Sequence, residues 1–240
     1  MPRTAEAGVI TGRKKTLLAG KMVTSFVMGT RKLYEWVHDN PAVEMRPSDF
    51  TNDPFTIARN ERMISVNSVL AVDLTGQVAS DTLLGRFFSG IGGQVDFIRG
   101  ASRSRGGKPI LALRSTARKG TVSRIMAVHE QGAGVVTSRG DVRCVVTDFG
   151  VADLWGKNVR ERASALIAIA HPSFRAELMA AARERRYVFA DRGDAEAGGP
   201  GLRRGDGAGG GPAGHGRAHR HGALRRGSGH AARRHRLRGP

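Results

Sequence analysis

A break in composition near residue 190 constrains this 240-residue chain more than any other feature. Residues 191–240 contain 15 Gly, 11 Arg, 8 Ala and 5 His, but no Ile, Val, Met, Phe, Tyr, Trp or Lys. Their large apolar side chains are Leu202, Leu224 and Leu237. So little apolar surface cannot offset the conformational entropy lost when a segment becomes ordered. We therefore expect a folded domain over residues 1–190 and a disordered basic tail over residues 191–240.

The composition of the tail leaves two interpretations open. Arg without Lys, together with Gly, Ala, His and Pro, is what GC-rich codons produce in an unselected reading frame, which favours a frameshifted carboxyl end. The alternative is a Gly/Arg-rich arm that binds nucleic acid nonspecifically through phosphates, because 11 Arg minus 4 acidic residues leave a charge of +7. The tail lacks the aromatic side chains on which bases stack, which weakens this alternative.

Several protein classes are excluded by the residues that the chain lacks. Cys144 is the single cysteine, so a disulfide scaffold is impossible. No run approaches the roughly 18 apolar residues of a membrane span, and no secretory signal opens the sequence. We expect a cytoplasmic protein without a membrane partner, in which Cys144 is a buried structural thiol.

Hydrophobic periodicity in residues 1–190 predicts an α/β domain of layered sheet and helices. Residues 64–74 carry Ile64, Val66, Leu70, Val72 and Leu74 at a period of two, which predicts one long strand before a turn at Thr75–Gly76. Further strands are expected within residues 21–28, 108–115, 134–138 and 142–150.

Capping signals place the helices between these strands. Helices are predicted within 30–40, from 54 behind an Asp53 cap, from 94, over 159–170 behind Asn158 and Glu161, and after Pro172.

Glycines at 90, 92 and 93 precede the helix expected from Gln94. Consecutive backbone N–H groups at a helix start can hold a phosphate or a thioester oxygen. The plainer interpretation is a tight turn that requires positive φ. The spacing does not match the dinucleotide-binding fingerprint.

Arg118 and Lys119 follow the strand expected within 108–115. Two cations in such a loop suit an anionic ligand, and the plainer interpretation is that both are solvated surface charges. His38, His129 and His171 are far apart in the sequence, so no metal site or catalytic triad is predicted.

Four segments together resemble the carboxyl-terminal domain of the acetyl-CoA hydrolase/transferase family, which includes 4-hydroxybutyrate and acetate CoA-transferases. They are "AGVITGRKKT" (7–16), "SDFTNDPFTIARNERMISVNSVLAVDLTGQVASD" (48–81), "SGIGGQVDFIRGASRSRGGKPILALRSTA" (89–117) and the segment 132–178, which contains "VVTDFGVADLWGK" and "AHPSFR". The resemblance extends over about residues 5–188. It implies a two-domain α/β protein that transfers CoA from an acyl-CoA to a small carboxylate, with coenzyme A as substrate and no covalently bound cofactor.

The resemblance also implies a covalent mechanism, in which a family glutamate attacks the thioester and forms an acyl-glutamyl anhydride. Residues that would contact CoA map to Asn52, Leu70, Gly92, Gly93 and Arg118, where relatives often carry Lys at the last position. Arginine at position 118 keeps the charge but changes its reach and donor geometry.

The nucleophilic glutamate of the family precedes "AGVITG", and Glu6 does not match its position. We therefore expect a fragment that lacks its nucleophile and is inactive alone. The rival interpretation is a non-catalytic interaction protein that binds nucleic acid through the tail. The sequence does not identify the acyl donor and acceptor or the oligomeric state. It also does not distinguish a hydrolase from a transferase.

Overall fold

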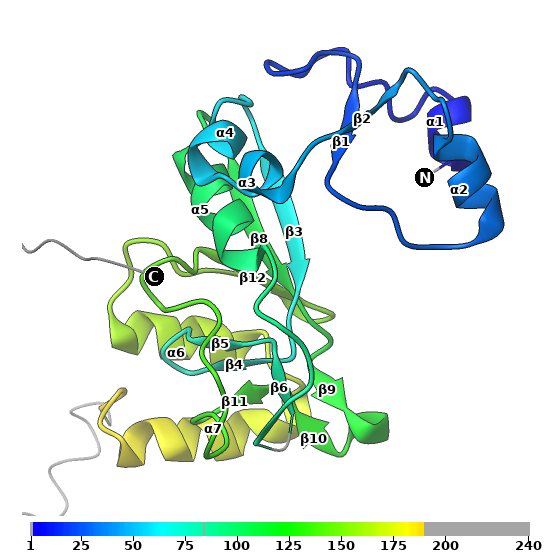
Figure 1. Cartoon of the computed structure of the whole chain (residues 1–240). Helices are drawn as coiled ribbons and strands as arrows, with labels where there is room; N and C mark the ends of the chain where they lie inside the picture. The colour runs from blue at the N-terminus through cyan, green and yellow to red at the C-terminus, as the bar shows by residue number, and fades with distance from the viewer. Residues whose placement is uncertain (1, 84, 190–240) are drawn as a thin grey trace, which may run out of the picture. The chain divides into compact units, whose positions relative to one another are not determined.

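The computed structural model describes residues 2–83 and 85–189 of the chain, drawn in Figure 1. The chain divides into two compact units, Met1–Ala197 and Gly198–Pro240, and the second lies wholly outside the described residues. The predicted disordered tail, residues 191–240, also lies outside them. The domain boundary at residue 190 therefore stays a prediction.

A four-stranded sheet with the order β13–β12–β8–β3 forms the centre of the first unit. β3 (Ile64–Ser68), β8 (Lys108–Ala112) and β12 (Cys144–Thr147) are parallel, and β13 (Gly150–Asp153) is antiparallel to β12. Helix α5 (Gln94–Arg103) contacts β8 and β3 and lies with α4 on one side of them in Figure 1. The predicted α/β layered class is confirmed.

Short strands form the remaining sheets, each of two or three strands. They are β1 (Met22–Thr24) with β2 (Val43–Met45), β11 (Ile125–Met126) with β4 (Ala71–Asp73) and β5 (Val78–Ala79), β6 (Thr82–Leu83) with β7 (Arg86–Phe87), and β9 (Thr116–Ala117) with β10 (Val122–Ser123). The strand predicted within 134–138 is wrong, because this segment meets β5 at a single bridge between Val78 and Thr137.

The single long strand predicted over residues 64–74 is also wrong. The chain changes sheets at Val69 and Leu70, whose N–H groups donate to the carbonyls of Ala112 and Ala79 respectively. β3 turns Ser65 inward, whereas Ile64 and Val66 are 57% and 65% exposed. A period of two marks alternate faces of a strand, but it does not show which face packs against a neighbouring layer.

Local capping positions the helices as predicted. The carboxylate of Asp53 accepts hydrogen bonds from the N–H groups of Phe55 and Thr56 at the start of α4. Asn158 and Glu161 form a reciprocal capping box at the start of α6. The helices are α1 (Pro2–Glu6), α2 (Arg31–Val37), α3 (Ser48–Thr51), α4 (Pro54–Ala58), α5, the 3-10 turn η1 (Arg118–Gly120), α6 (Val159–Ala168) and α7 (Pro172–Glu184).

The hydrophobic core joins the sheets to α5, α6 and α7. α6 contributes Leu166 and Ile167, and α7 contributes Leu178 and Ala182. In contrast, none of the described residues before Ile57 is buried. The amino-terminal segment therefore contributes no buried side chain to the hydrophobic core.

The turn after β4 is held by Asp73. Its Oδ1 accepts hydrogen bonds from the N–H and hydroxyl of Thr75 and from the N–H of Gln77. Gly76 adopts φ +89°, and a β-carbon there would collide with the guanidinium of the buried Arg162. The predicted Thr75–Gly76 turn is confirmed.

Candidate functional site

Helix α5 begins directly after the glycine-rich loop, as its sequence predicts. Gly92 adopts φ +62°, so the tight-turn interpretation holds for this residue. Gly93 is the N-cap at φ −90°, and no side chain caps the helix. The buried Gln94 donates from Nε2 to Oγ1 of Thr137 at 2.8 Å, which fixes the first turn against the 134–138 segment. The start of α5 is thus held in place by Gln94, and no side chain caps its first N–H groups.

Asn52 lies against this helix start, although 41 residues separate it from Gly93. It is the C-cap of α3, and its Oδ1 accepts a hydrogen bond of 3.0 Å from the hydroxyl of Thr51. A β-carbon at position 93 would collide with Nδ2 of Asn52 and would also lie 3.4 Å from the ring of Phe97. Close approach of Asn52, rather than positive φ, therefore explains the glycine at 93.

The arrangement directs hydrogen-bond donors toward one place. Because Oδ1 of Asn52 is held by Thr51, its Nδ2 faces Gly93 and the start of α5. Nδ2 makes no hydrogen bond within residues 2–83 and 85–189. A free amide donor beside the positive end of a ten-residue helix is suited to an oxygen that carries negative charge.

Two other predicted site residues lie at the same edge of the central sheet. The parallel strands β3, β8 and β12 all end at one edge, their carboxyl edge. Leu70, which is half-buried, follows β3, and Arg118 comes directly after β9, in the hairpin that the chain forms beyond β8. Residues 104–107 join α5 to β8, so α5 runs back along the sheet and Gly93 lies toward the carboxyl edge. Ligands of open α/β sheets bind at such edges.

Arg118 occupies the tip of the hairpin formed by β9, η1 and β10. Arg118, Lys119 and Gly120 all have positive φ, at +47°, +56° and +91°. Left-handed backbone costs energy for residues with a β-carbon, so the surrounding hairpin must hold it. Both cations are exposed. The structure thus brings Asn52 and Gly93 into contact, while Leu70 and Arg118 stand on separate segments of the edge.

A pair that the sequence analysis missed anchors the root of this hairpin. Asp148, directly after β12, accepts hydrogen bonds from the N–H of Ser115 at 2.8 Å and from its hydroxyl at 2.7 Å. Ser115 is fully buried, and its carbonyl accepts from the N–H of Arg124, where the chain returns from the hairpin. The pair joins two strand ends 33 residues apart, and no local pattern announces it.

The hydrogen bonds to Asp148 favour the ionised form of its carboxyl group. The hydrogen bonds from the backbone N–H and then the hydroxyl of Ser115 hold the pKa of this carboxyl below its usual value. A charged acceptor strengthens both bonds. The root of the hairpin is therefore fixed electrostatically as well as by strand pairing.

Cys144 is half-buried rather than buried, which corrects the prediction. It lies on the face of β12 opposite the core residue Val145, so only part of the side chain is covered. Burial first, and then the charge of Asp153, raise the pKa of its thiol. A thiol of this kind is a poor nucleophile.

The predictions about metal, membrane and nucleic acid can be compared only with residues 2–83 and 85–189. Across residues 2–83 and 85–189, no group of three or more His, Cys, Asp or Glu side chains could hold a metal ion. No helix in the same ranges is long and apolar enough to cross a membrane. The predicted binding of nucleic acid depends on residues 191–240, which lie outside the described part of the chain.

Known proteins share both the sequence and the fold. The model of the acetyl-CoA hydrolase/transferase C-terminal domain matches residues 29–182. The 4-hydroxybutyrate coenzyme A transferase of Clostridium kluyveri is 55% identical over 174 residues, which are 72% of this chain and 41% of the relative. The succinyl-CoA:cyclohexane-1-carboxylate CoA transferase of Geobacter metallireducens is 46% identical over 182 residues, or 76% of this chain and 42% of the relative.

Solved structures agree with this assignment. RipA from Yersinia pestis matches with a TM-score of 0.74 and 44% identity, over 78% of this chain and 42% of RipA. The 4-hydroxybutyrate CoA-transferase of Porphyromonas gingivalis matches with a TM-score of 0.66 and 46% identity, over 77% of this chain and 42% of that protein. The chain thus spans about two fifths of the length of these relatives. It belongs to the acetyl-CoA hydrolase/transferase family, and the part that it shares is the carboxyl-terminal domain.

Proposed function

We propose that this chain supplies the CoA-binding and oxyanion-stabilising half of an acyl-CoA:carboxylate CoA-transferase that acts in the cytoplasm. Its relatives include proteins named as 4-hydroxybutyrate and butyryl-CoA:acetate CoA-transferases, so the substrate class is an acyl-CoA thioester and a small carboxylate. The nucleophilic glutamate is expected outside these 240 residues, as the family motif implies.

In the proposed reaction, a glutamate carboxylate attacks the thioester carbonyl carbon, and the carbonyl oxygen becomes an oxyanion. Collapse of this intermediate breaks the carbon–sulfur bond, releases CoA as thiolate and leaves an acyl-glutamyl anhydride. The thiolate then attacks the glutamyl carbonyl, which forms glutamyl-CoA and releases the original acyl group as a carboxylate. The second carboxylate reverses these steps and departs as the new acyl-CoA.

The proposal assigns each residue of the carboxyl edge a share in this chemistry. Nδ2 of Asn52 and the first N–H groups of α5 would donate to the oxyanion. Arg118 would attract a phosphate of CoA, and Leu70 would contact its apolar part. Asp148 would keep the Arg118 hairpin in place through Ser115. Asp148 is then a positioning residue rather than a catalytic one.

One observation carries the proposal: Nδ2 of Asn52 faces Gly93 at the start of a helix that no side chain caps. Donors that are already oriented cost no reorganisation when negative charge develops, which is why such sites stabilise transition states.

A titration of CoA followed by amide NMR tests the proposal. Binding should shift the signals of residues 92–94 and 116–120 before those around Trp36 in α2 or Trp155 in the turn after β13. Replacing Gly93 by Ala should abolish these shifts because the new β-carbon displaces Asn52. Gly90→Ala is the matched control, since a β-carbon at position 90 meets no atom within 4 Å. Largest shifts around either tryptophan would contradict the assignment of the site.

A further inference from the structure

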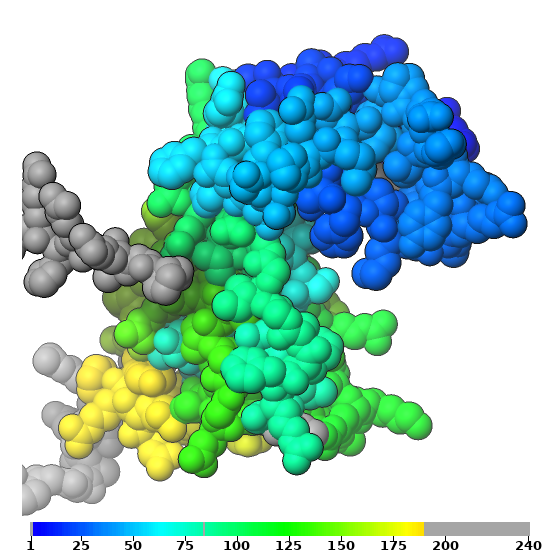
Figure 2. All heavy atoms as spheres, viewed as in Figure 1, coloured from blue at the N-terminus to red at the C-terminus, as the bar shows by residue number. Residues whose placement is uncertain are grey.

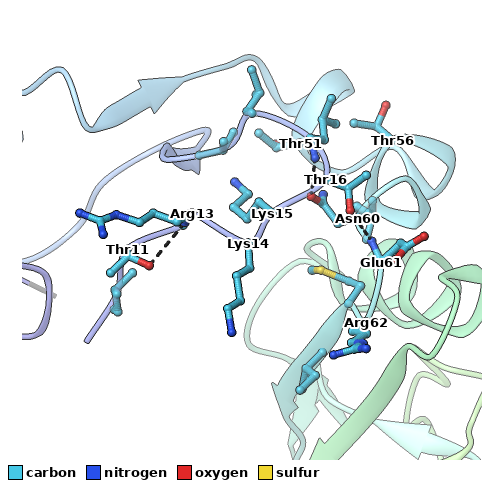
Figure 3. A pocket seen from close by; sticks show the side chains of 18 of the residues that line it. Thr11, Arg13, Lys14, Lys15, Thr16, Thr51, Thr56, Asn60, Glu61 and Arg62 are labelled. Carbon is cyan, nitrogen blue, oxygen red and sulfur yellow. Dashed lines mark hydrogen bonds between the residues drawn. The ribbon is translucent and has the colours of Figure 1, made fainter. Parts of the chain in front are cut away.

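A cleft of about 890 Å³ lies between the amino-terminal segment and the start of β3. One wall is formed by residues 9–18, which include the motif "VITGRKKT" that the proposed function does not use. The other walls come from α3, α4 and residues 60–64, with Phe97 of α5. Figure 2 shows the amino-terminal residues in blue against the cyan residues before β3, and Figure 3 shows the lining side chains. A volume of this size is typical of a small-molecule site.

This cleft adjoins the candidate CoA site, because Thr51, which donates to Asn52, and Phe97, which lies beside Gly93, also line the cleft. Its residues Asn60 and Arg62 are bonded to the end of α5, through Ser104 Oγ to the carbonyl of Asn60 at 2.6 Å and through the N–H of Arg62 to the carbonyl of Arg105 at 2.8 Å. The cleft therefore opens near the amino end of β3, whereas Gly93 lies at the opposite end of α5.

Hydrogen bonds pin the amino-terminal wall in place. The N–H of Leu17 donates to Oδ1 of Asn60 at 3.2 Å, and the N–H of Glu61 donates to the hydroxyl of Thr16 at 3.1 Å. The ammonium of Lys15 donates to the carbonyl of Lys21 at 2.9 Å, and partial burial lowers its pKa. The cleft is thus built by contacts over more than 40 residues of sequence rather than by an unattached loop.

The polar side of the cleft is cationic. Arg13, Lys14, Lys15 and Arg62 line it, and the single acidic residue of the lining, Glu61, pairs with Arg105 at 3.7 Å. Lys14 and Arg62 extend to the same side in Figure 3, whereas Arg13 extends away from them. Arg62 holds a positive φ of +54°, secured by its bond to Arg105. A strained backbone that fixes the direction of a cation is a feature of ligand sites.

The floor of the cleft is apolar and includes two aromatic rings. Phe50, Ile57, Met63 and Phe97 contribute to it, and Ile57 is 4% exposed. Cations beside an aromatic floor suit a molecule that joins phosphate groups to a flat ring. We propose that this cleft binds a nucleotide, with its phosphates at Lys14 and Arg62 and its base on Phe50 and Phe97. The proposal does not depend on the function assigned to the carboxyl edge.

Calorimetric titration of the full chain with ADP, pyrophosphate, adenosine and CoA tests this site. ADP should bind saturably, and pyrophosphate and adenosine should each bind about tenfold or more weakly, because each lacks half of the contacts. The variant Lys14→Ala/Arg62→Gly should raise the Kd for ADP by about tenfold or more. Glycine at 62 suits the positive φ, so this variant keeps the backbone and an unchanged thermal midpoint. Lys157→Ala/Arg160→Ala removes two exposed cations elsewhere and should leave the Kd unchanged.

The arms of this experiment separate the outcomes. No saturable ADP binding, equal losses in the two double variants, or equal affinity for ADP and pyrophosphate would each overturn the proposal. Equal losses would indicate diffuse attraction to a chain of net charge +18. If Lys14→Ala/Arg62→Gly weakens ADP but not CoA, the ligand is a free nucleotide. Parallel losses for both would identify the nucleotide half of CoA as the occupant of the cleft.

Discussion

Nδ2 of Asn52 occupies the space into which a β-carbon of residue 93 would project, so Asn52 and Gly93 are mutually dependent. The glycine lets the amide approach the first turn of α5, and the hydroxyl of Thr51 keeps Nδ2 turned toward that turn. Steric exclusion and donor orientation are therefore two consequences of one contact.

Replacing Gly93 by Ala should separate function from stability. The φ of −90° is allowed for alanine, which also lowers the entropy of the unfolded chain, so the free energy of unfolding should change by less than about 1 kcal/mol. Asn52 must nevertheless move, and CoA binding should be lost. Urea unfolding and CoA titration measure the two effects, with Gly90→Ala as control. Unfolding of Gly93→Ala would show that the glycine serves only the fold.

Asp148→Asn should destabilise the domain by about 1 kcal/mol at pH 7, because a charged acceptor is lost at a site that remains partly solvated. The pKa of Asp148 is lowered in the folded state, so its contribution is complete above the unfolded value of about 4 and is lost as the pH falls through the folded value. Wild-type and Asp148→Asn stabilities should therefore converge below about pH 4.

Urea unfolding between pH 2.5 and 7 measures this convergence. Asp49→Asn is the matched control, because Asp49 is exposed and its side chain makes no hydrogen bond within the described part of the chain. A constant difference between wild type and Asp148→Asn at every pH would contradict an ionised role for Asp148.

The chain alone should form no covalent intermediate with acetyl-CoA. The family resemblance implies a nucleophilic glutamate that precedes "AGVITG" and that Glu6 does not match, so we expect no glutamyl-CoA to form on this chain. Incubation with acetyl-CoA and borohydride, followed by mass spectrometry of peptides, tests this directly. A reduced glutamyl residue, or transfer to a labelled carboxylate above the uncatalysed rate, would refute the expectation.

Deletion of residues 191–240 should leave the thermal midpoint unchanged, because their apolar content is too low to join a core. Any affinity for DNA should fall with the loss of this +7 segment, and in the full chain it should decrease steeply with salt. Calorimetry and filter binding at several salt concentrations measure both. A large drop in the midpoint would mean that the tail packs on the domain.

The sequence by itself determined the features that depend on near neighbours. Asp53, the Asn158–Glu161 box and the helix start at Gln94 were all predicted correctly, because caps and turns satisfy backbone groups within three or four residues. The family and its glycine-rich loop were likewise evident from contiguous motifs.

Only the tertiary structure decided which faces and which distant residues meet. The exposed side of β3 and the change of sheet at Leu70 depend on the layers that pack around each strand. The contact of Asn52 with Gly93 and the bonds from Ser115 to Asp148 join segments that are 41 and 33 residues apart. Such pairs arise when parallel strands bring their carboxyl ends to one edge, and a pattern along the chain carries no information about that geometry.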